Sequence, residues 1–346
     1  MADYKTYLVT GGAGFIGSHY IRHIFDIHRH IRVINVDCLT YAGNTMNLKS
    51  LENNPDYIFF KADIDDKAAL TSIFTKYDID YIVNFAAETH VDRSIQNPDE
   101  FINTNIHGTL NLLNRARTKW IDGDEPLPGK KYVQISTDEV YGSLGKYGFF
   151  TEQTPLDPHS PYSASKASAD LLVKAYFDTY KLPVNITRCS NNYGPNQFPE
   201  KFIPLLIDNA LNGRKLPIYG DGMQIRDWLY VNDHVRAIDM VCSNGIPGEI
   251  YNIGGHNEKR NIDIAKTILK VLSGTLPDTD VRKSHINPDL IEFIEDRKGH
   301  DRRYAIDPSK IRNELGWAPE TVFEDGLQLT VEWYLNNPEW VGHVTA

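Results

Sequence analysis

Cysteine is scarce in this sequence of 346 residues, which contains only Cys38, Cys189 and Cys242. An odd number of widely spaced cysteines forms neither a disulfide framework nor a metal-binding cluster. The pattern is typical of a protein from a reducing compartment, and no metal site is predicted.

Long apolar runs and an excess of positive charge are also missing. The formal net charge of −10 argues against nucleic acid as a partner, because a surface that binds phosphates along a strand must be basic. No apolar run is long enough to span a membrane, and the opening MADYKTYLVT lacks the features of a signal peptide. We therefore expect a cytoplasmic protein that binds a small molecule, with local basic residues holding any anionic group.

Short apolar stretches alternate with helical ones through the first half of the chain. The expected strands cover residues 7–10, 32–37, 57–63, 81–87 and 131–137, and the expected helices cover 15–27, 66–77 and 102–120. Strands separated by helices form a parallel, doubly wound sheet, and nearly continuous apolar strands fit a sheet that is covered on both faces. The sequence thus predicts an α/β fold of the Rossmann type.

The composition changes near Gly194, after which prolines, glycines and basic residues become frequent. We expect residues 1–193 to form the nucleotide-binding domain, with 228–255 returning to it. Residues 194–346 are expected to form mainly a smaller, interleaved substrate domain. Near the end of the chain, Leu327, Val331 and Tyr334 recur at helical spacing, which is typical of a helix packed on a core.

The stretch GGAGFIG at 11–17 follows an expected strand and opens an expected helix. Gly11, Gly12, Gly14 and Gly17 satisfy the pattern of a tight turn that lets the backbone approach a pyrophosphate at the helix N-terminus. Asp37, about 20 residues later, can accept hydrogen bonds from ribose hydroxyls and disfavours a 2′-phosphate, so NAD is predicted rather than NADP. The alternative is a glycine turn required only for packing.

Two further features follow expected strands on the same side of the sheet. Asp63 can reach an adenine or simply cap a loop, and the small residues of Phe85-Ala86-Ala87 would let the backbone approach the cofactor. The carboxyl ends of parallel strands are where open α/β sheets bind ligands. A nucleotide site is therefore expected at this edge.

Tyr162 and Lys166 lie four residues apart in PYSASK, on one face of a helix that begins at Pro161. We expect the ammonium to lower the pKa of the phenol, so that Tyr162 can take a proton from an alcohol while its carbon gives hydride to NAD. Such pairs also occur by chance on surfaces, but here the pair follows a nucleotide-binding turn.

The stretch ISTDEVYGS at 135–143 places Asp138 and Glu139 where an apolar strand ends. One interpretation is a capping box, with Ser136 as N-cap and Glu139 reaching back to its backbone. The other is catalytic. Neighbouring carboxyl groups can be driven to different pKa values, which makes one a proton donor and the other an acceptor.

The motifs TGGAGFIG, YSASK, NIHGTLNLL and ELGWAP resemble the extended short-chain dehydrogenase/reductase family, in its nucleotide-sugar branch. AAETHVDRSI, STDEVYG, CSNNYGP, PIYGDGMQIRDWLYV and DRKGHDRRYAID extend the likeness, in the same order, to dehydratases that act on a nucleoside-diphospho-glucose, with dTDP as the favoured nucleotide. The resemblance implies oxidation at C4 of the sugar, loss of water across C5–C6 and return of hydride to C6. It also implies Glu139 as the base at C5, Asp138 as the acid at O6 and Thr137 as the partner of the C4 oxygen.

The complete predicted sites are as follows. The catalytic set is Thr137, Asp138, Glu139, Tyr162 and Lys166. The predicted cofactor-binding set is Gly11, Gly12, Gly14, Phe15, Ile16, Gly17, Asp37, Thr40, Asp63, Ile64, Phe85, Ala86, Ala87, Thr104, Tyr162, Lys166 and Asn192. The substrate-binding set, which the resemblance supplies, is Thr89, Thr137, Asn191, Lys201, Tyr219, Arg226, Asn261, Arg297 and His300, with Arg226 and Arg297 at the diphosphate.

Three alternatives remain at this stage. The chain could be a UDP- or GDP-sugar dehydratase, a 4-epimerase, or an NAD-binding scaffold without activity. Asp138 argues against the epimerase, because related epimerases have a small or hydroxylated residue there. A homodimer is also implied by the resemblance, through the helix that holds Tyr162 and the one after Asn103. These helices carry more apolar residues than packing on one face of the sheet needs, which permits a dimer contact. The residues are Leu110, Leu112, Leu113, Leu171 and Leu172.

Overall fold

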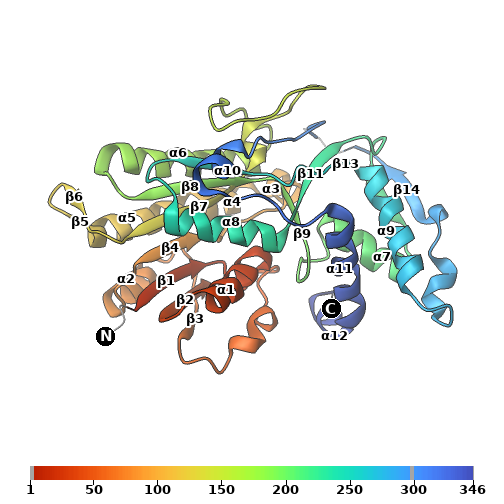
Figure 1. Cartoon of the computed structure of the whole chain (residues 1–346), viewed down its shortest axis with the longest axis horizontal. Coiled ribbons are helices and arrows are strands. Elements are labelled where there is room, and N and C mark those ends of the chain that lie inside the picture. Colours follow the sequence, from red (N-terminus) through yellow and green to blue (C-terminus); the bar gives the residue numbers. More distant parts are fainter. Residues whose placement is uncertain (1–3, 297–299, 346) are drawn as a thin grey trace.

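The computed structural model describes residues 4–296 and 300–345, and its largest element is a seven-stranded parallel sheet (Figure 1). The strand order is β12-β8-β7-β4-β1-β2-β3, in which the direction of progression reverses between β1 and β4. This confirms the predicted Rossmann-type fold. The strands are β1 (Lys5–Thr10), β2 (Ile31–Asp37), β3 (Tyr57–Lys61), β4 (Tyr81–Asn84), β7 (Lys131–Thr137), β8 (Val184–Cys189) and β12 (Ile250–Ile253).

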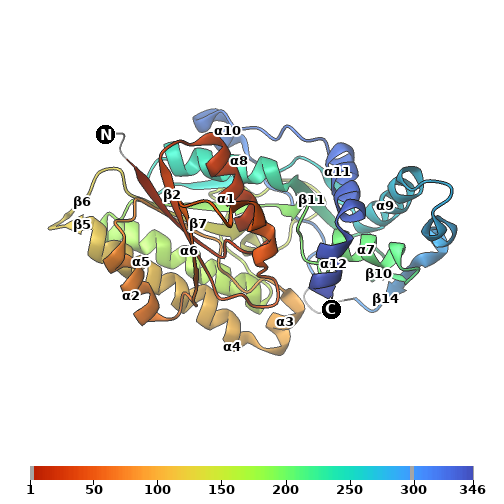
Figure 2. The same ribbon diagram turned by 90° about the horizontal axis from the view of Figure 1, so that it is seen from below.

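Helices cover both faces of this sheet, which explains its nearly uniform apolar strands. In Figure 2, α1 and α8 lie on one face and α2, α4, α5 and α6 on the other. The bounds are α1 (Phe15–Ile27), α2 (Lys67–Lys76), α3 (Val91–Gln96), α4 (Pro98–Phe101), the π-helical turn η2 (Ile102–Gly108), α5 (Thr109–Trp120), α6 (Pro161–Tyr180) and α8 (Val231–Asn244).

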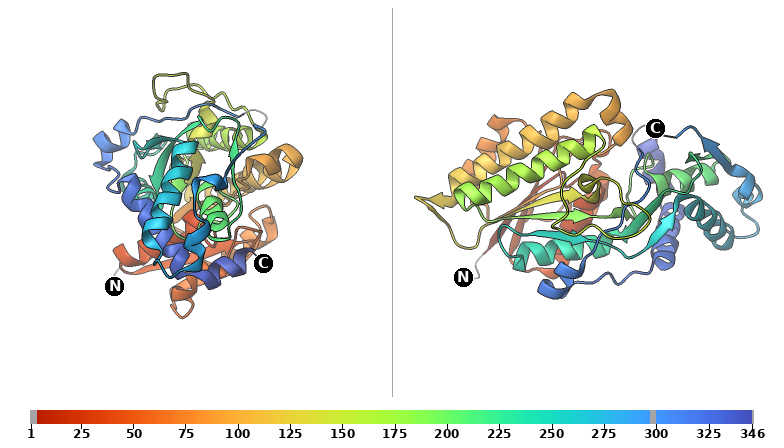
Figure 3. Two further views of the ribbon diagram at one scale, coloured as in Figure 1. Left: turned by 90° about the vertical axis from the view of Figure 1, so that its right-hand side faces the viewer. Right: turned by 90° about the horizontal axis from the view of Figure 1, so that it is seen from above.

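A smaller part of the molecule lies beyond one end of the sheet (Figure 3). It contains the three-stranded sheet β13-β11-β9 and the parallel pair β10-β14. Its strands are β9 (Asn191–Tyr193), β10 (Leu216–Tyr219), β11 (Ile225–Tyr230), β13 (Glu258–Arg260) and β14 (Ile291–Ile294). Its helices are α7 (Phe202–Leu211), α9 (Asn261–Thr275), α11 (Phe323–Asn336) and α12 (Pro338–Thr345), whereas α10 (Ser309–Leu315) packs beside the large sheet against β12 and α8.

Short elements complete the chain between these. They are the 3-10 turns η1 (Thr45–Leu51), η3 (Asp138–Tyr141), η4 (Val281–His285) and η5 (Pro288–Leu290), and the hairpin of β5 (Ile121–Asp122) with β6 (Glu125–Pro126). No helix within residues 4–296 and 300–345 is long and apolar enough to cross a membrane.

The expected elements match the observed ones best where the pattern is longest. The helix 15–27 and the strand 131–137 have the predicted bounds, whereas β3 and β4 end at residues 61 and 84 instead of 63 and 87. The prediction for β3 was too long because the carboxylate of Asp63 accepts a hydrogen bond from the backbone of Asp65, which forms a turn. Asp63 and the stretch 85–87, which were predicted to bind the cofactor, therefore follow these two strands and lie outside the sheet.

Separate apolar cores support the two parts of the molecule, and the large sheet has one on each of its faces. One lies between the large sheet and α1 and α8, and another is formed by α7, α9 and α11. Leu327, Val331 and Tyr334 are buried in the second core, as their helical spacing predicts. The apolar stripe of α11 therefore serves packing.

Helices α5 and α6 expose fewer apolar side chains than the sequence predicts. Leu112 and Leu113 are fully buried in the core beside the sheet, so the prediction that they exceed the need of one sheet face is wrong. Leu110 and Leu172 are half-buried, and only Leu171 is largely exposed, at 62%. The exposed apolar surface is therefore smaller than the sequence indicates.

A buried ion pair joins α6 to the sheet. The Nε of Arg188 on β8 lies 2.8 Å from the carboxylate of Asp170 on α6, and the two side chains are 4% and 1% exposed. The ring of Tyr141 lies against the same guanidinium, with 4.8 Å from its centre to Cζ. Because either charge alone would be buried without a partner, this pair fixes the helix that carries Tyr162.

We expect Asp170→Asn to lower the free energy of unfolding by about 3 kcal/mol, because it leaves the Arg188 charge buried and unpaired. Chemical denaturation measures this loss. The matched control is Asp178→Asn on the same helix, which breaks an exposed pair with Lys174 and should cost less than about 1 kcal/mol. Equal losses in the two variants would contradict the assigned role.

Candidate active site

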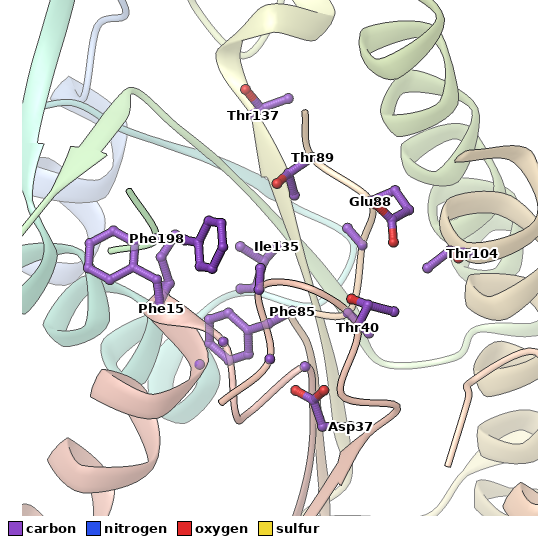
Figure 4. Close-up of a pocket in the computed structure, with 18 of the residues that line it drawn as sticks. Phe15, Asp37, Thr40, Phe85, Glu88, Thr89, Thr104, Ile135, Thr137 and Phe198 are labelled. Atoms are coloured by element: carbon purple, nitrogen blue, oxygen red, sulfur yellow. The ribbon is translucent and has the colours of Figure 1, made fainter. Parts of the chain in front are cut away.

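A cavity of about 330 Å³ opens at the carboxyl ends of β1, β2, β4 and β7, where the strand order reverses. Figure 4 shows Asp37 toward one end of it and Thr137 toward the other, with Phe15, Phe85 and Phe198 between them. The predicted residues that line it are Gly11, Gly14, Phe15, Ile16, Gly17, Asp37, Thr40, Asp63, Ile64, Phe85, Ala86, Ala87, Thr89, Thr104, Thr137, Glu139, Tyr162, Lys166, Asn191, Asn192 and Lys201. Parts of the chain that are distant in sequence thus meet in one site.

The glycine turn between β1 and α1 forms one wall of the cavity. Gly11 has φ +66°, and a Cβ atom there would lie 2.6 Å from the backbone nitrogen of Ala86. Neither the conformation nor the space permits a side chain. Gly12 does not line the cavity, since a Cβ atom there would meet Asn35 behind the turn. Packing therefore requires Gly12, and it also requires Gly17, where a Cβ atom would lie 2.4 Å from the carbonyl oxygen of Gly11.

Asp37 ends β2 beside this turn. Its carboxylate accepts hydrogen bonds from the backbone of Ala13 and of Leu39, both at 2.9 Å. Burial raises the pKa of Asp37, and these two hydrogen bonds lower it. Each carboxylate oxygen keeps a further lone pair for a ribose hydroxyl, so the residues present fit a dinucleotide without a 2′-phosphate.

The strand end at Thr137 differs from the predicted capping box. Thr137, not Ser136, is the N-cap of η3, and its hydroxyl accepts the backbone N–H of Glu139 at 3.2 Å. The hydroxyl of Ser136 is buried without a hydrogen-bond partner in the described chain. The prediction was wrong by one residue because β7 continues through Thr137, which leaves Ser136 inside the strand.

Asp138 and Glu139 occupy different environments although they are adjacent. Glu139 lines the cavity, whereas Asp138 is 2% exposed and does not. Burial raises the pKa of Asp138 well above its usual range, and the negative charges of Glu139 and Asp227 raise it further. The hydroxyl of Thr137 lies 3.4 Å from its carboxyl group. Arg226 and the Thr137 hydroxyl act in the opposite direction, but burial is the largest cause, so Asp138 holds a proton more tightly than an aspartic acid in water.

Tyr162 enters the cavity from the first turn of α6. The helix begins there because the Ser160 hydroxyl accepts the backbone N–H of Ser163 at 3.1 Å and Pro161 occupies the first position. Lys166, one turn later, donates to the carbonyl of Ile135 at 2.7 Å. Both side chains therefore face the same end of the cavity, as the spacing predicts.

The expected effect of Lys166 on Tyr162 is not observed. Burial raises the pKa of Tyr162 well above its usual range and Glu139 raises it further, while a hydrogen bond with the Thr137 side chain lowers it. Burial also lowers the pKa of Lys166, whose ammonium is bound to Ile135. The prediction of a lowered phenol pKa was wrong because it ignored desolvation.

Lys201 and Thr89 meet across the cavity. The ammonium of Lys201 donates to the carbonyl and the hydroxyl of Thr89, at 3.1 and 3.2 Å. Asn191 and Asn192 lie at the adjoining end of β9, and the side-chain oxygen of Asn192 accepts from the ring of His234 at 2.8 Å. The structure therefore brings four predicted ligand-binding residues to one wall.

The other predicted residues lie outside the cavity lining. Arg226 donates to the carbonyls of Ile225 and Asp301, at 2.8 and 2.9 Å, and its guanidinium lies over the ring of Tyr304. The hydroxyl of Tyr219 lies 3.4 Å from Asp92, and its ring meets that of His300. Asn261 begins α9, and its side-chain oxygen is buried. Arg297 lies outside the described residues.

The sequence reasoning missed part of the lining. The missed residues are Val36, Cys38, Ala42, Gly43, Ala62, Glu88, Ile135, Ser136, Cys189, Ser190, Gln197, Phe198 and Glu200. Several lie next to a predicted residue, as Glu88 does beside Thr89 and Glu200 beside Lys201. Their adjacency in AAETH and NNYGPNQFPEKF was the available signal.

The raised pKa of Asp138 predicts a pH dependence of stability. Between the ordinary aspartate pKa of 3.8 and its higher folded value, only the unfolded chain loses this proton, so stability falls as pH rises. We expect Asp138→Asn to remove this loss, so that its advantage in unfolding free energy grows from pH 4 upward. Denaturation at several pH values measures it.

The control is Asp221, which is exposed and whose hydrogen bond with Arg302 lowers its pKa to about 2. That bond stabilises the fold above the ordinary pKa and is lost as pH falls, so Asp221→Asn should give a deficit that is largest near neutral pH. A pH-independent effect of Asp138→Asn would show that the group is ionised in the folded protein.

Comparisons with known proteins agree over nearly the whole chain. A family model described as GDP-mannose 4,6 dehydratase matches residues 8–330. The dTDP-glucose 4,6-dehydratase of Neisseria meningitidis is 54% identical over 339 residues, which are 96% of this chain and 94% of that protein. The enzyme of the same name from Escherichia coli is 53% identical over 96% of this chain and 94% of its own length.

Solved structures of nucleotide-sugar enzymes are also similar to this chain over nearly its whole length. The dTDP-glucose 4,6-dehydratase of Streptomyces venezuelae with NAD and TYD bound is 44% identical, with a TM-score of 0.89 and coverage of 98% of this chain and 99% of that one. The UDP-glucose 4-epimerase of Thermotoga maritima is 29% identical, with a TM-score of 0.84 over 96% of this chain and 99% of its own. From these similarities, the chain belongs to the dTDP-glucose 4,6-dehydratase family.

Proposed function

We propose that this protein is an NAD-dependent dehydratase that converts dTDP-glucose into dTDP-4-keto-6-deoxy-glucose. The observation that carries the proposal is the pair at the end of β7, where the buried Asp138 adjoins Glu139, which lines the cavity that also receives Tyr162. The names of the relatives at 54% and 53% identity support the same activity. When bound, NAD takes a hydride from C4 of the sugar and returns it to C6, which leaves the reaction redox-neutral.

Tyr162 is proposed as the base for the C4 hydroxyl proton. Its phenol faces the cavity and shares a hydrogen bond with Thr137, whose hydroxyl would also contact the C4 oxygen. A buried phenol gives up its proton less easily than one in water, and the hydrogen bond with Thr137, which lowers the pKa of Tyr162, favours the phenolate that this step needs. Lys166 also fixes this end of the site through Ile135.

Elimination of water requires a base and an acid, which the next two residues supply. Once C4 is a ketone, the C5 hydrogen is acidic, and Glu139 removes it as a proton. The C6–O bond breaks as C5=C6 forms, and Asp138 gives its proton to the departing hydroxyl, so that water leaves. Burial keeps Asp138 protonated for this purpose, while Glu139 faces the cavity.

Cationic side chains are proposed to hold the diphosphate of the substrate, which an overall acidic protein does not attract. Arg226 and Arg297 are the proposed diphosphate ligands, because a guanidinium can bind phosphate through two parallel bonds. Lys201 with Thr89 would contact the sugar, and Asn191, Tyr219, Asn261 and His300 complete the proposed substrate set. In this proposal, residues 194–346 form mainly the substrate domain, and residues 1–193 with 228–255 hold the cofactor.

A homodimer in the cytoplasm is the proposed working form. Leu171 on α6 and Ile102 at the start of η2 are exposed apolar residues, which supports a contact between two copies through these helices. The three cysteines are free, which suits a reducing compartment.

The experiment that tests the activity supplies dTDP-, UDP- and GDP-glucose separately in deuterated water. We expect a 4-keto-6-deoxy product from dTDP-glucose with deuterium at C5, because the C5 proton exchanges through Glu139. Mass spectrometry and NMR identify the product. An epimerised sugar that keeps its 6-hydroxyl would contradict the proposal, and preference for UDP- or GDP-glucose would correct the nucleotide.

Separate variants test the proposed roles. Tyr162→Phe should slow C4 oxidation itself by about a hundredfold or more, because the base is lost. Asp138→Asn should leave C4 oxidation intact and slow the loss of water by a similar factor, because the acid is lost. Single-turnover absorbance at 340 nm follows the first step, and product analysis follows the second. If both variants lose both steps equally, the division of roles is wrong.

A further inference from the structure

Asn47 in η1 connects the glycine turn with the last helix of the chain. Its side-chain NH₂ donates to the carbonyl of Ala13 at 2.9 Å, and its side-chain oxygen accepts from the indole N–H of Trp340 at 2.7 Å. Trp340 lies on α12, 293 residues later, and both side chains are buried. Figures 1 and 2 show α12 at the end of α1 that carries the turn.

Ala13 is the centre of the glycine turn, between Gly12 and Gly14. Its N–H is held by Asp37, and its carbonyl accepts from the backbone of Asn44 and from the Asn47 side chain. A turn rich in glycine has many accessible conformations, so external hydrogen bonds must select the one that fits a pyrophosphate. Asn47 is one of the groups that make this selection.

Trp340 determines which way the Asn47 amide faces. An indole N–H can only donate, so the atom of Asn47 that meets it must be the oxygen. The NH₂ of Asn196 also donates to this oxygen, at 3.2 Å. The opposite orientation of the amide would place its NH₂ against two donors and its oxygen against the carbonyl of Ala13. The tryptophan therefore turns the donor of Asn47 toward the glycine turn.

The same region is braced through the loop after β9. Arg22 on α1 donates to the Asn47 carbonyl and to the Asn196 side chain, at 2.6 and 3.2 Å. Tyr334 on α11 donates to the carbonyl of Gln197, a residue of the cavity lining. Helix α11 thus contacts the cavity lining at Gln197, and α12 contacts Asn47, which holds the glycine turn.

We infer that Asn47 and Trp340 are positioning residues for the nucleotide-binding turn. Helix α12 then acts on cofactor affinity, although it lies outside the cavity lining. This inference rests on the proposed function, because it takes the turn to hold NAD. It concerns the binding of the cofactor and not the chemistry of the sugar.

The test compares the binding of NAD to purified protein freed of nucleotide, without any sugar. Trp340→Phe keeps an aromatic ring but loses the N–H donor together with the volume of the fused five-membered ring. We expect NAD affinity to fall about fivefold, the effect of one lost hydrogen bond. Asn47→Asp keeps the acceptor for Trp340 and replaces the donor to Ala13 with an oxygen, so its loss should be larger. Calorimetry measures both dissociation constants.

Trp333→Phe is the matched control. Trp333 stacks edge-on against Trp340, with ring centres 5.0 Å apart, and its indole N–H makes no hydrogen bond within the described residues. This variant should bind NAD like the unchanged protein, even where its melting temperature falls as much as that of Trp340→Phe. A purely structural role of Trp340 would instead give the same affinity in both variants.

A double variant tests the proposed route. If Trp340 acts through Asn47, then Trp340→Phe should add little further loss of affinity in the Asn47→Asp background. Independent, additive losses would overturn the inference, and so would unchanged NAD affinity in Trp340→Phe. Failure of the unchanged protein to bind NAD would instead contradict the proposed function, so the two failures are distinguishable.

Discussion

Desolvation at the end of β7 is the constraint on which the catalytic arrangement depends. The β7 strand is an inner strand of the sheet and is buried along its whole length, and its last residues line the cavity where the chain turns at η3. Burial raises the pKa of the aspartate at this place, and the next residue faces a cavity. Two chemically similar groups are thereby made different by position alone. The parallel sheet is what brings the nucleotide-binding turn and α6 to the same edge.

The sequence predicts much of this active-site arrangement, because the patterns that produce it are local or periodic. The strand, turn and helix around GGAGFIG follow from short patterns, and the four-residue spacing of Tyr162 and Lys166 places them on one helix face. The positions of Asp138 and Glu139 at a strand end follow in the same way. For the nucleoside base of the sugar-nucleotide substrate, the sequence offers only the family resemblance. No residue was assigned to that base from its chemistry or spacing.

What the sequence does not reveal is the surroundings of each group. Tyr162 was expected to be acidified by Lys166, yet burial dominates, and burial is a property of the folded assembly. Leu112 and Leu113 looked like surplus apolar surface but fill the core. The N-cap of η3 shifted by one residue because the end of a strand depends on pairing with its neighbour. The bond between Asn47 and Trp340 joins residues too distant for any local pattern.

The contact of α12 with Asn47 beside the glycine turn also affects the order in which the parts of the protein can fold. Domains generally form as the chain is synthesised, N-terminal parts first. Here β1, the turn and β2 are made within the first 37 residues, while the strand β12 that completes the sheet and the tryptophan that orients Asn47 come after residue 249. The nascent chain on the ribosome thus carries the glycine motif long before it has the finished turn. The bond between Asn47 and Trp340 can consequently form only after residue 340 has been synthesised.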